Sequence, residues 1–100
     1  MADIMDGLGH KLAILGEDGI VYSLSHTNMG HVLANGEVYN YKNSKVGHFA
    51  PNGYVYNHDN SHIGTIHPDG TVFDYDNHRI GKVVGGHIES GGAALLLLVR

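Results

Sequence analysis

Glycine recurs at a fixed interval of 17 residues through most of this chain. One series is Gly19, Gly36, Gly53 and Gly70, and a second is Gly30, Gly47, Gly64 and Gly81. Valine follows each glycine of the first series two positions later, and an aromatic residue follows the valine at Tyr22, Tyr39, Tyr56 and Phe73. Self-similarity at a fixed spacing indicates one structural unit that is copied and packed on its neighbours, because a unit this short cannot bury its apolar face alone.

Each copy contains two short apolar segments and two turns, which predicts one β-hairpin per copy. The turn between copies has the form Pro51-Asn52-Gly53, and the turn inside a copy centres on an Asn such as Asn43; both residue patterns suit tight turns. No helical spacing of apolar residues occurs between Gly16 and Val84, so an antiparallel meander is expected. The copies run approximately over 19–35, 36–52, 53–69 and 70–86.

The pattern extends weakly at both ends. Ile4, Met5 and Asp6 lie 17 residues before Val21, Tyr22 and Ser23, while Gly86-His87-Ile88 resembles the start of a further copy after one deleted residue. Partial copies at the two ends are expected to pair and close the sheet, which would remove its exposed edges. The prediction is therefore an all-β fold, residues 1–100 as a single domain, with hairpins in a closed ring or barrel of pseudo-four-fold symmetry.

The C-terminal segment 91–100 departs from the repeat. We expect a short helix with Ser90 as its N-cap, and a final buried strand is the alternative. The apolar run Ala93–Val99 should be largely buried, because in water it would form an aggregation-prone patch.

Gly47, Gly64 and Gly81 are predicted inside strands, where glycine normally weakens the structure. Two explanations are open: an aromatic ring of a neighbouring strand lies flat across the glycine, or the sheet bends sharply toward an axis. The aromatic column that begins at Tyr22 is expected to fill the core, because a thin domain with eight aromatic residues can hardly leave half of them exposed.

The phrase Gly-x-Val-Tyr-Asn followed by Ile-Gly-x-Val/Ile, with an Ala/Leu-rich end, resembles the small bacterial domains of the four-fold β-flower family. The likeness spans roughly residues 16–100. The resemblance implies hairpins arranged like petals about a pseudo-four-fold axis, and a family without an established activity. No catalytic or binding residues come with it.

Composition excludes several classes of function. The formal net charge is -4 and six Lys and Arg are spread along the chain, so no basic stripe is available for nucleic acid. The absence of Cys suits a reducing compartment, and the cytoplasm is the expected location. Neither a secretory signal nor a membrane-spanning run is recognisable, and no membrane partner is expected.

Nine histidines are the one compositional hint of ligand binding. His31 and His48 share one column of the repeat, whereas His26 and the histidines named below each fall in a different column. No symmetric metal site is therefore predicted, and neither a metal nor another cofactor is expected. Asp74-x-Asp76-Asn77 is similar to the opening of a calcium loop but lacks the later Gly and Glu, which favours an ordinary turn. The residues proposed for a ligand site are Tyr41, Tyr75, His58, His62, His67 and His78.

The sequence favours a non-enzymatic structural or protein-interaction module. Its partner would be another protein or another copy of the chain. No nucleophile elbow surrounds Ser23 and Ser25, so an enzyme is not expected. The alternative is a module that binds carbohydrate or metal through the exposed Tyr and His side chains.

Overall fold

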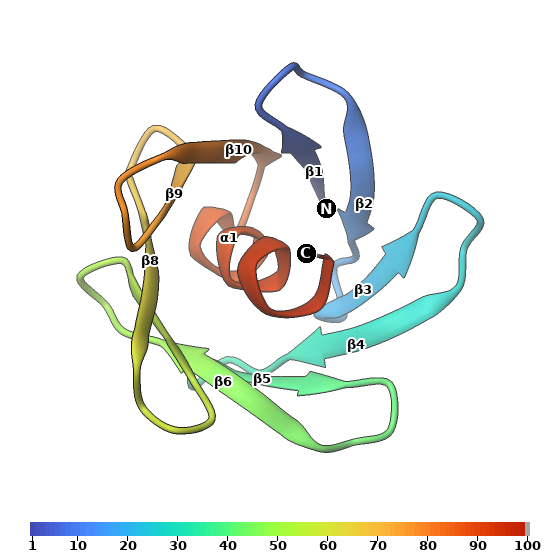
Figure 1. Ribbon diagram of the computed structural model, residues 1–100. Helices are drawn as coiled ribbons and strands as arrows, with labels where there is room; N and C mark the ends of the chain where they lie inside the picture. The colour runs from blue at the N-terminus through green and yellow to red at the C-terminus, as the bar shows by residue number, and fades with distance from the viewer. Residues whose placement is uncertain (100) are drawn as a thin grey trace.

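Ten antiparallel strands form a closed barrel around a C-terminal helix in the computed structural model, which describes residues 1–99 (Figure 1). The strands are β1 (Ala2–Asp6), β2 (Lys11–Leu15), β3 (Ile20–Ser23), β4 (Asn28–Val32), β5 (Glu37–Asn40), β6 (Lys45–Phe49), β7 (Tyr54–Asn57), β8 (His62–Ile66), β9 (Thr71–Asp74) and β10 (Arg79–Gly85). Each strand pairs with its neighbour in sequence, and β1 pairs with β10 to complete the ring. The all-β closed meander is therefore confirmed.

The barrel contains five hairpins, so the pseudo-four-fold arrangement predicted from the sequence is wrong. We call the hairpins petals 1 to 5, from β1–β2 to β9–β10. The segment around Ile4, expected as a partial copy, forms the first strand of a complete petal. Ala13 occupies the position of the glycine Gly30 of the next petal, and the different tip sequence Gly7-Leu8-Gly9 hides the repeat further. At the other end, Gly86-His87-Ile88 leads into a helix and forms no further copy.

One β-bulge in every petal sets its shape. In petal 2, Val21 lies opposite Gly30 and Tyr22 opposite Asn28, so Met29 is the extra residue. Equivalent register shifts occur in all five petals. A bulge bends its strand and increases the local twist, which suits strands that must curve around an axis. The extra residues form what we call the bulge ring: Leu12, Met29, Val46, Ile63 and Ile80.

The core is built from one valine-like residue per petal and from the C-terminal segment. The side chains of Ile4, Val21, Val38, Val55 and Val72 are fully buried. The aromatic column, in contrast, lies outside this core, so its predicted role as core is wrong. Tyr22, Tyr39, Tyr56 and Phe73 are only half-buried, because the strand alternation that turns the valine inward turns the next residue outward.

The C-terminal segment forms an α-helix, α1 (Ile88–Ala94), that continues as a π-helical turn, η1 (Leu95–Val99). It lies in the middle of the ring of strands (Figure 1). The predicted helix and the predicted burial are confirmed: Ala93, Ala94 and Leu95 are at most 1% exposed. The N-cap, however, is His87 and not Ser90.

Size complementarity joins this helix to the petals. At the start of the helix the helix residues are small and the facing barrel residues are large. A Cβ added to Gly91 would lie 2.6 Å from Val83, and one added to Gly92 would lie 2.5 Å from Ile66. Toward the end of the helix the sizes are reversed, because large leucine side chains face glycines in the strands. The glycine neighbours of successive leucines are Gly81 for Leu95, Gly64 for Leu96, Gly47 for Leu97 and Gly30 for Leu98.

The strand glycines are thus required by close approach, as predicted, but not by an aromatic ring. A Cβ on Gly47 would lie 2.8 Å from Leu97 and closer still to the carbonyl oxygen of Tyr56. Four successive helix residues therefore face four successive petals. For this match, each residue must rotate about the helix axis by close to one-fifth of a circle. An α-helix, with 3.6 residues per turn, rotates by more than that at each residue. The π-helix is wider and has more residues per turn, so its rotation per residue is closer to the required value.

No helix in the described part of the chain is both long enough and apolar enough to cross a membrane.

Candidate functional site

In four of the petals the tip turn is held by one side chain that accepts two backbone hydrogen bonds, whereas Ser23 Oγ in petal 2 accepts one, from the N–H of Thr27. In petal 4, Asn57 Oδ1 accepts from the N–H groups of Asp59 and Ser61 at 2.9 and 3.0 Å. Asn40, Asp6 and Asp74 accept the equivalent pairs in petals 3, 1 and 5. With the backbone satisfied inside the turn, the other tip side chains are free to point into solvent.

The residue that follows this acceptor is exposed in each petal, and in three petals it is large and apolar or aromatic. Leu24, Tyr41 and Tyr75 are 55, 68 and 70% exposed, respectively. His58 holds the same position in petal 4 and is also exposed. Tyr41 and Tyr75, predicted as contact residues, are therefore placed on the surface by equivalent tip turns.

The tips and the C-terminal end of the helix share one face of the barrel. A groove of about 410 Å³ is lined by Asp74, Tyr75 and Asp76 of the fifth tip together with Ile63 of the bulge ring and Leu96 of η1. Because every petal has the same register, the other tips and bulge-ring residues hold equivalent positions around the helix. We call this surface the tip face.

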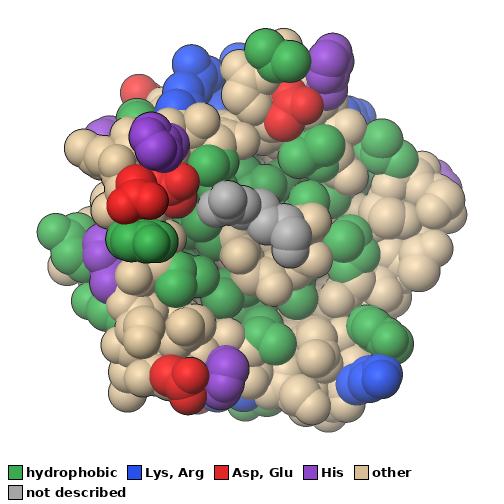
Figure 2. All heavy atoms as spheres, in the orientation of Figure 1, with side chains coloured by type: hydrophobic (Ala, Val, Ile, Leu, Met, Phe, Trp, Pro, Cys, Tyr) green, Lys and Arg blue, Asp and Glu red, His purple; other side chains and the backbone are tan. Residues whose placement is uncertain are grey.

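The tip face is apolar at its centre and charged at its edge. Figure 2 shows hydrophobic side chains around the middle of this face, interspersed with other groups, and most of the acidic, basic and His side chains farther out. The bulge ring and residues Leu97, Leu98 and Val99 pack against the core but remain partly accessible. A contiguous apolar surface surrounded by polar groups is typical of an interaction site.

The structure does not bring the predicted histidines together. His58 lies at the tip of petal 4, 3.5 Å from Asp59, and His62 lies on β8, stacked on Tyr54 with 4.5 Å between ring centroids. His67 lies beyond β8 in the turn at the other end of the barrel, where its ring packs on Phe73. No shared ligand geometry joins these groups in the described residues.

His78 lies with Asp74 and Asp76 in the tip turn of petal 5. One ligand atom from each residue lies within 4.8 Å of the other two. Asp74 is already engaged, since its Oδ1 accepts two backbone hydrogen bonds and its Oδ2 lies 3.7 Å from His78. The calcium-like sequence thus forms an ordinary tip turn with the same hydrogen bonds as petals 3 and 4.

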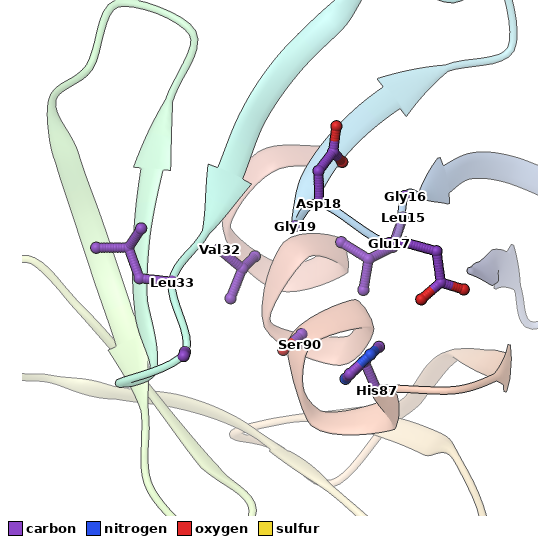
Figure 3. Close-up of a pocket in the computed structure, with 10 residues that line it drawn as sticks. Leu15, Gly16, Glu17, Asp18, Gly19, Val32, Leu33, His87 and Ser90 are labelled. Atoms are coloured by element: carbon purple, nitrogen blue, oxygen red, sulfur yellow. The ribbon is translucent and has the colours of Figure 1, made fainter.

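A second pocket lies at the opposite end of the barrel, around the start of α1 (Figure 3). Its volume is about 200 Å³, and its ionisable and nucleophilic groups include Glu17, His87 and Ser90. The pKa of Glu17 is lowered by a hydrogen bond from the N-terminal amino group, by the charge of that group and by His87. Among the described residues no hydrogen bond links Ser90 to His87 or Glu17, so no paired nucleophile and base is formed.

Reasoning from the sequence missed the bulge ring and Leu24. The signal was present: Leu12, Met29, Val46, Ile63 and Ile80 follow the same 17-residue spacing as the glycines. Each precedes its strand glycine, or Ala13 in petal 1, by one position and looks like an ordinary strand residue. Only the register shift shows that these residues pack around the helix end.

The comparisons agree with this geometry. A family model described as 5-fold beta-flower protein matches residues 1–96, which covers all five petals and most of the central helix. No curated protein and no solved structure matches the chain.

Proposed function

This chain belongs to the 5-fold beta-flower protein family, and we propose that it is a non-enzymatic module that binds another protein through its tip face. The proposal rests on one observation: the bulge ring, the end of the helix and the exposed tip residues Leu24, Tyr41 and Tyr75 all lie on the same surface. Aromatic residues are enriched at protein interfaces, and an apolar centre with a polar rim is the usual anatomy of an interface.

The distribution of reactive groups supports a non-enzymatic role. Among the described residues, no polar or charged side chain is buried. Of the four carboxylates whose pKa is lowered, Glu17 is stabilised by the N-terminal amino group, and Asp6, Glu37 and Asp69 are stabilised by hydrogen bonds within exposed turns and strand edges. Catalytic groups are usually perturbed by burial or by like charges within a cleft, and neither situation applies to these three.

The alternative, a module that binds carbohydrate or metal, has less support. The imidazoles proposed for it lie at both ends of the barrel, and Tyr41 and Tyr75 belong to petals that are not neighbours in the ring. A small-ligand site needs several groups that converge on one pocket.

Site-specific photo-crosslinking tests the proposal. A photoreactive phenylalanine analogue is placed at Tyr75, at Tyr41 or, as a control, at Leu33, which is 37% exposed near the opposite end of the barrel. Adducts to protein should form in cells from positions 75 and 41 and not from position 33. Equal adducts from position 33, or none from the tips, would contradict the tip face as the binding surface.

A further inference from the structure

The tip face has the size and the charge pattern of a surface that binds a second copy of itself. We infer that two copies associate face to face, about a two-fold axis that lies in the plane of the face and passes through petal 4. This inference rests on the proposed function, for which it names the partner.

The dimensions are sufficient for a stable dimer. The molecule is a disc of 30 × 29 × 20 Å. A face of this width has a projected area of about 700 Å², which lies within the range of about 600–1,000 Å² that each partner buries in an interface of standard size. The apolar centre of the face supplies the burial that such an interface requires.

Charges on the tips are distributed unevenly between the petals. The tip of petal 3 carries Lys42 and Lys45, whereas that of petal 5 carries Asp74 and Asp76 together with His78 and Arg79. Lys45 is paired with Glu37 at 3.0 Å, and Asp74 is 3.7 Å from His78. Within the described chain Lys42 and Asp76 have no ion-pair partner, so these two charges are available for an intermolecular contact.

The proposed axis brings these charges together. A two-fold rotation about petal 4 exchanges petals 3 and 5 and also petals 2 and 1, because the petals follow one another in order around the ring. Lys42 and Asp76 hold the same position in their tips, as do Tyr41 and Tyr75. Each Lys42 therefore meets Asp76 of the other copy, and each Tyr41 meets Tyr75 of the other copy.

The remaining charged contacts of this arrangement bring like charges together. Lys45 and Arg79 hold the same position, but Lys45 is already neutralised by Glu37. Petal 4 lies on the axis and meets itself, so Asp59 faces its own copy. Substitution Asp59→Asn should consequently tighten the dimer, since like charges that face each other across an interface are unfavourable.

Charge reversal gives a specific test by sedimentation velocity on the full chain at micromolar concentrations. The wild type should be a dimer. Lys42→Asp and Asp76→Lys should each weaken self-association by at least about tenfold, because each variant places like charges against each other twice. An equimolar mixture of the two variants should form a heterodimer, because both contacts then become attractive again. That recovery also shows that the variants are folded.

Glu89→Lys is the matched control, because Glu89 is exposed at the opposite end of the barrel, where it lines a different pocket from that of Glu17, together with Pro51 and His67. It should leave the dimer intact. A monomeric wild type, a mixture that stays monomeric, or a dimer disrupted only by Glu89→Lys would overturn the inference. A monomer that still crosslinks to a different protein through position 75 would overturn the self-association and leave the proposed function standing.

Discussion

At the scale of single residues, the strand glycines are the positions least able to change. In Gly47→Ala the new Cβ would meet Leu97 Cδ1 at 2.8 Å and would come closer still to a backbone carbonyl oxygen, that of Tyr56. Overpacking of this kind costs about 1–3 kcal/mol, and removing the leucine as well, in Gly47→Ala/Leu97→Ala, should not restore stability because the contact with the backbone remains. Gly86→Ala is the control, since nothing lies within 4 Å of its Cβ position. Urea unfolding should separate the two single variants, and equal midpoints would refute the packing argument.

The tip acceptors give a second prediction at this scale. Hydrogen bonds from the backbone N–H of His10, and then of Leu8, lower the pKa of Asp6 below its ordinary value of 3.8. A carboxylate whose pKa is lower in the folded state stabilises the fold above its unfolded pKa, and this contribution is lost as the pH falls through the folded pKa. Asn57 accepts the same bonds without a charge, so Asp6→Asn should remove the pH-dependent part alone. The stability advantage of the wild type over this variant should shrink between about pH 7 and about pH 3, as measured by urea midpoints. An advantage that is the same at both pH values would contradict this assignment.

At the scale of elements, the central helix supplies much of the core. Leu95 is 1% exposed and packs against Gly81, whereas Leu8 at the tip of petal 1 is 84% exposed. Leu95→Ala should lower the free energy of unfolding by about 2–5 kcal/mol, the usual cost of truncating a buried leucine. Leu8→Ala makes the same chemical change in solvent and should alter it by less than about 0.5 kcal/mol. Thermal unfolding of both variants checks this, and similar melting temperatures would show that the helix is dispensable for stability.

The elements also show what the sequence was able to predict. The strands and turns of petals 2 to 5 were predictable because Asn, Asp and Gly determine the backbone locally, and Tyr41 and Tyr75 were correctly placed at exposed tips. The number of petals was not, because Ala13 and the tip around Leu8 depart from the repeat although the hairpin forms. The groove of the tip face could not be predicted either, because Ile63 and Leu96 are brought together only by the bulge in β8 and by the rotation of the helix.

At the scale of the whole molecule, closure should make unfolding cooperative. Linear repeat arrays can lose terminal units separately, but here petal 1 is paired on both sides, by β2 with β3 and by β1 with β10. Ile4→Ala in petal 1 and Ile66→Ala in petal 4 remove side chains that are 0 and 4% exposed. Each should lower the midpoint of one shared transition, with far-UV circular dichroism and Tyr fluorescence coinciding. Separate transitions for the two probes in Ile4→Ala would show that petal 1 detaches on its own.

The pairing of successive leucines with successive petals also restricts how such a protein can evolve. Duplication of one 17-residue unit would add a strand glycine with no leucine to fill the space beside it, and loss of a unit would leave a leucine without its glycine. A change in the number of petals therefore requires a matching change in the length and pitch of the C-terminal segment. Recombination within the repeats alone would give a ring with a defective core, so proteins with different petal numbers should differ in their tails as well as in their repeats.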